Sequence, residues 1–143
     1  MNSWLLDVNV LLGCCWTNHA DHTALFTWLT SVEEWATCPI SELGFLRISM
    51  TIAYRASFED ARKSLSSLRS LGAHRFLVDD IDIAALPVVA SYKETTDAHL
   101  VTLAKQHGLK LATLDTGLIA KSWAVGVRKI HSNKMKSPFL RPH

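Results

Sequence analysis

Short apolar runs of strand length alternate along the chain with longer amphipathic stretches. The first run, WLLDVNVLL at residues 4–12, stops at Asp7 and resumes after Asn9. It predicts a buried strand that carries Asp7 to its carboxyl end. Further strand-like runs lie at residues 35–38, 75–78, 109–114 and 127–131. Strands that alternate with helices are typical of an α/β domain with a mainly parallel sheet.

Between the strand-like runs, apolar residues recur at intervals of three and four, which predicts helices. These helices are expected at residues 10–16, 23–33, 39–50, 57–71, 81–91, 95–107 and 118–123. Ser57 has the position of an N-cap, and Thr95 or Thr96 is expected to cap the helix that carries Asp97. Pro87 interrupts the pattern of residues 81–91.

The length and composition predict one globular domain over residues 1–143. The chain is 48% hydrophobic and shows no repeat or linker, and it has no apolar run near the ~20 residues that span a bilayer. The first residues, MNSWLLDVN, lack the basic region of a signal peptide, so we expect a cytoplasmic protein that does not enter a membrane. Cys14, Cys15 and Cys38 have no CxxC spacing and are expected to be buried, reduced thiols.

The net charge of +2 hides an uneven distribution. Up to Asp115, nine Lys and Arg residues stand against thirteen Asp and Glu residues, whereas six basic residues and no acid follow. The chain therefore ends in a basic tail, from about residue 132. Such a tail is compatible with a solvated end and with contact to a polyanion, and the sequence does not separate the two.

Four acids occupy the ends of predicted elements. Asp7 and Asp115 follow strands, and Glu42 and Asp97 lie in the first turns of helices. Helix capping explains each acid singly. Together, however, they form a set of hard oxygen ligands of the kind that Mg²⁺ or Mn²⁺ prefers, and such ions support phosphodiester cleavage.

Other catalytic signatures are missing from the sequence. There is no GxGxxG, P-loop or GxSxG motif, and no cysteine is convincingly matched with a histidine. The stretch LATLDTGLIA contains one Asp-Thr-Gly triplet of the aspartic protease type. Those enzymes need two such lobes of β-structure, so a protease reading is disfavoured.

At this point the chain resembles the PIN-domain ribonucleases, and among them the VapC-type toxins of bacterial toxin–antitoxin pairs. The matching stretches are LLDVNVLL at 5–12, the segment from His19 through His22 to Trp28, ISELGFLR at 40–47 and TDAHLVTLAKQHGLKLATLD at 96–115. The resemblance implies a three-layer α/β fold with a mainly parallel sheet flanked by helices. It also implies an endoribonuclease dependent on Mg²⁺ or Mn²⁺ and inhibited by a cognate antitoxin.

The resemblance assigns a role to each acid. Asp7, Asp97 and Asp115 would be metal ligands, and Glu42 would orient water or a second ion. Asn9 and Thr113 match polar positions that support the ligands. Water would attack in line and leave a 3′-hydroxyl and a 5′-phosphate.

Substrate contacts are expected from the basic residues near the end of the chain, namely Arg128, Lys129, Lys134 and Lys136. Structured RNA such as tRNA is a plausible substrate for this family, and we expect a homodimer. Two rival readings stay open: a catalytically silent PIN-like module that binds RNA or protein, and a flavodoxin-like signalling domain with a similar acidic edge.

Several other residues are given structural roles. His19 and His22 are expected to be structural or at the surface, and a hydrogen bond is expected to satisfy His99. Arg47 is expected to pair with Glu42 in preference to RNA, the alternative partner. Trp16, Trp28, Phe45 and Phe58 are assigned to the core, and some of them would line a groove for an antitoxin helix.

Overall fold

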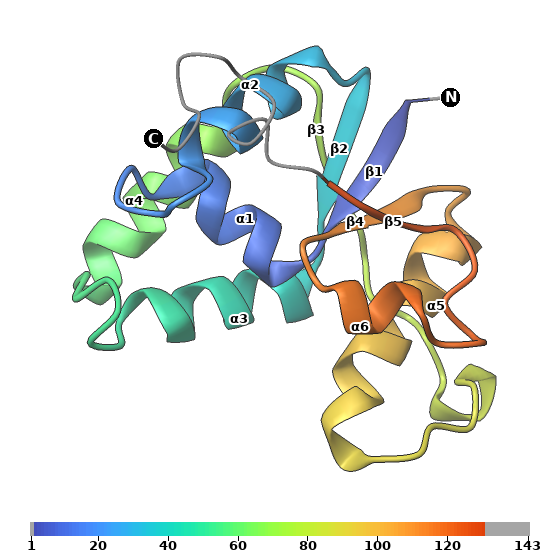
Figure 1. Cartoon of the computed structure of the whole chain (residues 1–143). Helices are drawn as coiled ribbons and strands as arrows, with labels where there is room; N and C mark the ends of the chain where they lie inside the picture. The colour runs from blue at the N-terminus through green and yellow to red at the C-terminus, as the bar shows by residue number, and fades with distance from the viewer. Residues whose placement is uncertain (1, 131–143) are drawn as a thin grey trace, which may run out of the picture.

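The computed structural model describes residues 2–130, which form a central sheet with helices on both faces (Figure 1). The strands are β1 (Ser3–Leu6), β2 (Glu34–Thr37), β3 (His74–Phe76), β4 (Lys110–Thr113) and β5 (Val127–Lys129). Their spatial order is β3-β2-β1-β4-β5, and every pairing is parallel. The predicted three-layer α/β fold is confirmed.

Within residues 2–130, six α-helices connect the strands. They are α1 (Val8–Cys15), α2 (His22–Ser31), α3 (Pro39–Ser49), α4 (Phe58–Arg69), α5 (Thr95–Gln106) and α6 (Thr116–Ile119). Helices α1 to α4 contribute to the apolar cluster on one face of the sheet, and α5 and α6 contribute to the cluster on the other. Ser57 accepts a hydrogen bond from the Asp60 backbone N–H and caps α4 as predicted.

The sheet is buried on both faces because successive side chains of a strand point in opposite directions. In β1, Trp4 and Leu6 pack into the cluster of α1 to α4, whereas Leu5 packs into the cluster of α5. Leu5 and Leu6 are fully buried. Burial of each such leucine contributes about 1.5–3 kcal/mol.

A close approach of two helices fixes the surroundings of the first strand end. Gly44 of α3 lies against Val8, the first residue of α1, and a Cβ at Gly44 would come within 2.7 Å of Val8 Cγ2. Only glycine therefore lets α3 pack this closely beside the residue that follows Asp7.

Three local predictions are wrong. Residues 81–91 contain only the short 3₁₀ turn Ile83–Ala85. Ile81 packs against the α5 cluster, but Ile83 is 83% exposed and Val88 is 96% exposed, so the run lacks a continuous apolar face, and Pro87 cannot donate a helical hydrogen bond. Neither threonine caps α5: Glu94 is the N-cap and makes no side-chain capping bond, and Thr95 already lies in the helix.

The third wrong prediction concerns an aromatic residue. Trp16, Trp28 and Phe45 do pack in or against the core cluster, as expected. Phe58 is 46% exposed at the start of α4 instead.

All three cysteines are free thiols, and Cys14 and Cys38 are buried. No helix between residues 2 and 130 is long and apolar enough to cross a bilayer.

Candidate active site

Asp7 is held rigidly where β1 passes into α1. It is the N-cap of α1, and its Oδ1 accepts a hydrogen bond of 2.8 Å from the backbone N–H of Val8. Its Oδ2 accepts a bond of 2.7 Å from the hydroxyl of Thr113. The residue is only 7% exposed, so its carboxylate has little freedom to rotate.

Thr113 and Asn9 join the ends of β1 and β4 around this carboxylate. The Thr113 Oγ1 accepts hydrogen bonds from the Asp115 backbone N–H at 3.0 Å and from Asn9 Nδ2 at 3.4 Å. Asn9 Oδ1 in turn accepts from the backbone N–H of Leu114 at 3.2 Å. The two polar residues matched by resemblance thus lie directly beside Asp7 and fix the chain that carries Asp115.

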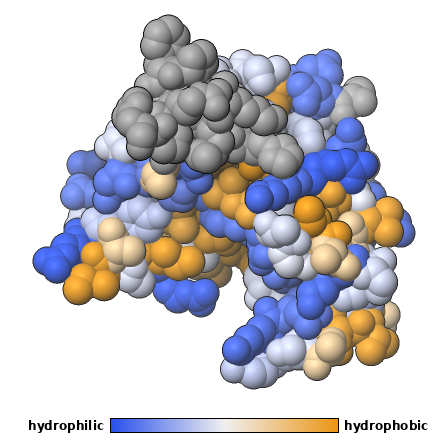
Figure 2. Space-filling view, in the orientation of Figure 1, coloured by the Kyte–Doolittle hydropathy of each residue, from blue (hydrophilic) through white to orange (hydrophobic). Residues whose placement is uncertain are grey.

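Asp115 and Asp97 line a common cavity of about 410 Å³, together with Glu94, Lys93, Lys121 and Trp123. Asp115 is exposed and caps α6, accepting from the backbone N–H groups of Gly117 at 2.8 Å and Leu118 at 3.3 Å. Asp97 is half-buried in the first turn of α5. In the space-filling view a notch separates the part of the molecule formed by α3 from the part formed by α5 and α6 (Figure 2).

Burial and neighbouring acids raise the pKa values of Asp97 and Asp7. Burial is the main reason that the pKa of Asp97 rises to about 6, and the charges of Asp7, Asp115 and Glu94 add to it. Burial also raises the pKa of Asp7, with Asp115 contributing and the bonds from Thr113 and Val8 opposing. No basic side chain of residues 2–130 forms an ion pair with any of the three. Within this range the three aspartates therefore lack a direct counter-ion, although Lys93 and Lys121 line the same cavity.

The donor set has the chemistry of a divalent-cation site, because carboxylate oxygens are what Mg²⁺ and Mn²⁺ prefer. Within the described part of the chain, however, no group of three or more His, Cys, Asp or Glu side chains is arranged to hold a metal ion as it stands. The aspartates interact through their charges without closing on a common point. The carboxylate oxygens are thus suitable ligands for a cation, but the side chains of the described residues are not positioned to coordinate one together.

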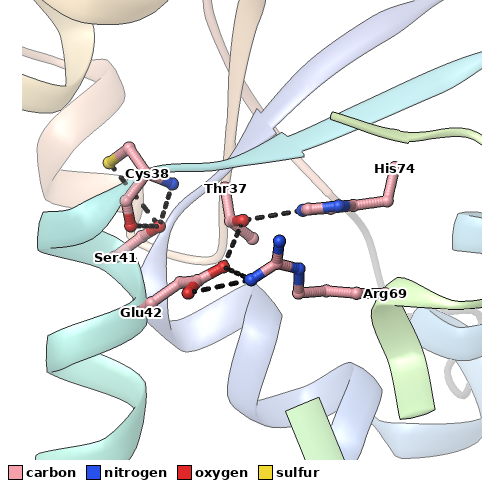
Figure 3. A network of polar contacts seen from close by, with 6 residues as sticks. All are labelled: Thr37, Cys38, Ser41, Glu42, Arg69 and His74. Atoms are coloured by element: carbon pink, nitrogen blue, oxygen red, sulfur yellow. Dashed lines mark hydrogen bonds and ion pairs between the residues drawn. The ribbon is translucent and has the colours of Figure 1, made fainter. Parts of the chain in front are cut away.

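Glu42 belongs to a separate hydrogen-bond network, away from the three aspartates (Figure 3). Its carboxylate accepts hydrogen bonds from Arg69 Nη1 at 3.1 and 3.3 Å and from the Thr37 hydroxyl at 2.6 Å. The expected pairing with Arg47 is wrong, because α4 brings Arg69 to this carboxylate instead. Glu42 is also not among the charges that raise the pKa of Asp7 or Asp97.

His74 completes this second network. The Thr37 hydroxyl donates its hydrogen bond to Glu42. It therefore accepts a hydrogen bond from His74 Nε2, which lies 2.7 Å away. Burial and the neighbouring Arg69 lower the pKa of His74 to about 4, so the ring is neutral at pH 7. Sequence reasoning missed Thr37, Arg69 and His74. A signal was present for the first, since β2 and β4 both end in Ala-Thr.

The register of the strands sends these two threonines to opposite faces. Leu5 pairs with Ala36 and Leu6 pairs with Ala112, so Thr37 is level with Leu6, and Thr113 lies one step further along. Side chains one step apart point to opposite faces. Glu42 is thus held on the face of α1 to α4, while Asp7 and Thr113 lie on the face of α5.

The histidines have the structural roles expected of them. His99 Nε2 lies 2.7 Å from Asp79 Oδ2, and His22 Nδ1 lies 2.9 Å from the carbonyl oxygen of Gly13. His19 Nδ1 accepts a bond of 3.0 Å from the backbone N–H of Asp21. Each of the three rings thus has a polar contact within the protein.

Two of the basic residues predicted to bind substrate, Arg128 and Lys129, lie in β5, where Lys129 pairs in register with Thr113. Arg128 donates to the carbonyl oxygen of Val127, and both Arg128 and Lys129 line a cavity of about 520 Å³ beside Trp4 and Trp28. Neither lines the cavity of Asp97 and Asp115. Lys134 and Lys136, with the rest of the basic tail, lie outside the described residues.

Comparison with known proteins identifies the family. The model of the PIN domain matches residues 4–123 of the chain. The chain belongs to the PIN-domain family. This PIN protein is 40% identical over 121 residues to Ribonuclease VapC38 of Mycobacterium tuberculosis, covering 80% of the chain and 86% of that protein. It is 36% identical over 138 residues to Ribonuclease VapC39 of the same species, covering 88% and 97%. The resemblance to VapC-type proteins is confirmed.

Solved structures agree on the fold. VapBC2 from Rickettsia felis, bound to a DNA fragment from its promoter, includes a chain that matches this PIN protein with a TM-score of 0.61. The match covers 90% of this chain and 99% of that one at 10% sequence identity. At this identity the likeness concerns the arrangement of strands and helices alone.

Proposed function

We propose that this PIN protein is an endoribonuclease and the toxin of a bacterial type II toxin–antitoxin pair. The observation that carries the proposal is the set formed by Asp7, Asp97 and Asp115, three mutually repelling carboxylates at the carboxyl edge of a PIN sheet. Its relatives of 33–40% identity are named ribonucleases of the VapC group. Both facts favour RNA cleavage over a binding role alone.

In this proposal the three aspartates would hold Mg²⁺ or Mn²⁺. When bound, the ion supplies positive charge that makes water a better nucleophile and stabilises the oxygens of the reacting phosphate. Asp7 is fixed for this task by Thr113 and by the N–H of Val8. The burial and repulsion that raise the pKa of Asp97 also make a bound cation favourable there.

Side chains of the protein would position the attacking water and the site itself. Asp7 and Asp115 orient a water for in-line attack on phosphorus. The bond from phosphorus to the 3′-oxygen breaks, which leaves a 3′-hydroxyl and a 5′-phosphate. Glu42 acts through position, because its bonds to Arg69 and Thr37 fix the first turn of α3 beside the strand ends.

A cognate antitoxin is the second partner in this proposal. A cavity of about 340 Å³ opens between α1, α2 and α4, and its walls include Phe26, Leu68 and Leu71. Such a surface suits the apolar side of an antitoxin helix. An antitoxin Arg or Lys that reached the aspartates would replace the cation and inhibit the enzyme. If Asp7→Asn with Asp97→Asn left the affinity for the antitoxin unchanged, this mode of inhibition would be wrong.

The proposal also retains a homodimer in the cytoplasm, for which light scattering of the purified chain is the direct test. The decisive experiment on function is RNA cleavage with Mn²⁺ or Mg²⁺, with EDTA and Asp7→Asn as controls. We expect cleavage that both controls abolish. Cleavage that survives both would contradict the metal-assisted mechanism, and absence of cleavage on every RNA tested would favour a silent binding module.

A further inference from the structure

A groove between α3 and α4 is separate from the cavity of the aspartates. It has a volume of about 430 Å³, within the usual range of ligand sites. Glu42 and Leu46 of α3 form one wall, and Glu59, Arg62, Lys63 and Arg69 of α4 contribute to the other. We call this surface the α4 groove.

The charge that the α4 groove presents to solvent is positive. Of its two acids, Glu42 is neutralised by Arg69. Arg62 and Lys63 are both exposed, and neither forms an ion pair with any residue between 2 and 130. These two cations outweigh the single remaining acid, Glu59. An anionic ligand is therefore favoured.

Two exposed aromatic rings lie beside the arginines of α4, outside the residues that line the groove itself. Phe58 is 46% exposed, and the Arg62 guanidinium carbon lies 5.4 Å from its ring centroid. Phe76 is 43% exposed, and the guanidinium carbon of Arg69 lies 5.3 Å from its ring centroid. Exposed rings held beside guanidinium groups are the elements from which proteins build stacking sites for unpaired bases.

The α4 groove also starts next to the strand ends. Glu42 lies at its α3 wall, and the partner of Glu42, Thr37, is level with Leu6, the residue before Asp7. Figure 1 shows that α3 and α4 lie on the same side of the sheet as α1, whose N-cap is Asp7. A strand of nucleic acid that occupies the groove would reach the carboxyl edge of the sheet, and the aspartates lie beyond this edge on the α5 face.

We propose that the α4 groove binds an unpaired segment of the RNA substrate. Phe58 and Phe76 stack on bases, and Arg62 and Lys63 contact phosphates. The inference rests on the proposed function, since it names a binding surface for the same substrate. It favours unpaired over duplex RNA because the bases of a duplex are already stacked on one another and cannot reach the rings.

The test measures binding apart from cleavage. The full chain with Asp97→Asn binds a fluorescent single-stranded RNA of twelve nucleotides, and a duplex of the same sequence, at several salt concentrations. Added Arg62→Gln and Lys63→Gln should reduce the slope of log affinity against log salt by about 0.7 for each cation removed. Phe58→Leu should weaken single-strand binding by roughly 5- to 100-fold and leave duplex binding nearly unchanged.

Lys105→Gln is the matched control, because it removes an exposed lysine from the last turn of α5, away from the groove. It should leave the salt slope and the affinity as they were. The substituted side chains are exposed, and a thermal melt of each variant checks the fold. The proposal would be overturned if Lys63→Gln and Lys105→Gln changed the salt slope equally. It would also be overturned if Phe58→Leu weakened the binding of single-stranded and duplex RNA equally.

Cleavage by the chain with Asp97 intact separates this inference from the proposed function. If that protein cleaves RNA and the groove variants bind RNA normally, the groove assignment fails and the function stands. If it cleaves no RNA but binding still depends on Arg62, Lys63 and Phe58, the catalytic proposal fails and the binding surface stands.

Discussion

The carboxylates of Asp7 and Glu42, near the ends of neighbouring strands, each accept a hydrogen bond from a threonine hydroxyl, but only one of them has a counter-ion. Thr113 donates to Asp7 at 2.7 Å, and Thr37 donates to Glu42 at 2.6 Å. Glu42 also has Arg69 as a counter-ion, whereas no basic side chain in the described range pairs with Asp7. One acid is neutralised within the fold and the other is left for an external cation.

This difference indicates a structural role for Glu42 and a role in catalysis for Asp7. A carboxylate with an internal cation keeps its charge at little cost and ties elements together. Asp7 and Asp97 instead have raised pKa values, and burial and neighbouring acids are the cause. Perturbed carboxylates that gather at a sheet edge are typical of functional sites.

The largest effect is expected from removing charge at the aspartates. Asp7→Asn or Asp97→Asn should lower RNA cleavage by more than about 100-fold, the upper end of what a residue that only supports a metal ligand costs. Glu42→Gln should lower it less, because Glu42 is bound to Arg69 and Thr37. Initial rates with Mn²⁺ compare the three. A loss with Glu42→Gln as large as with Asp7→Asn would contradict the distinction.

Next in size is the loss of the hydroxyl that holds Asp7. Thr113→Val removes the donor to Asp7 Oδ2 and the acceptor of the Asp115 N–H. We expect cleavage to fall by roughly 10- to 100-fold, with a weaker apparent affinity for Mn²⁺. Thr113→Ser keeps the hydroxyl and serves as the control. Equal activity of the Val and Ser variants would show that this bond does not matter.

In the second network, Arg69→Leu removes the counter-ion of a Glu42 side chain that is 17% exposed. The free energy of unfolding should fall by about 1–3 kcal/mol, because the partly buried carboxylate of Glu42 loses its charged hydrogen-bond donor. Urea unfolding of Arg69→Leu, Glu42→Gln and the double variant forms a mutant cycle. The double variant should regain part of the loss, and simple additivity would mean that the two side chains do not interact.

The smallest effect concerns pH and the stability of the site. Because the folded-state pKa of Asp97 is about 6 and its usual value is 3.8, the folded chain binds more protons than the unfolded chain between these values. Asp97 therefore lowers stability as the pH rises from 4 to 6. At pH 7.5 without divalent cations, Asp97→Asn should be more stable than the parent by about 1 kcal/mol, after allowance for partial exposure.

Urea unfolding at pH 7.5 and at pH 4 measures this difference. At pH 4 most of it should vanish, because Asp97 is then largely protonated in the folded chain. A constant difference at both pH values would mean that packing, and not charge, is responsible. Mn²⁺ at pH 7.5 should raise the stability of the parent more than that of the variant.

Local pattern was enough to predict much of this protein. The strand–helix alternation, the cap at Ser57 and the acids at element ends all follow from burial periodicity and from hydrogen bonds between near neighbours in sequence. The same local logic failed for most of residues 81–91 and for Phe58, because an apolar residue is buried only if another element covers it, and Ile83, Val88 and Phe58 are left exposed.

The partners of the acids depended on contacts between distant segments. Glu42 meets Arg69, twenty-seven positions away, rather than Arg47 on its own helix, because α4 packs against α3. The strands β2 and β4 end in the same pair, Ala-Thr, and nothing in either segment tells their threonines apart. A register offset of one residue turns Thr37 and Thr113 to opposite faces of the sheet. The sequence by itself determined that acids would gather at this edge, and the pairing of the strands decided which of them lack a counter-ion.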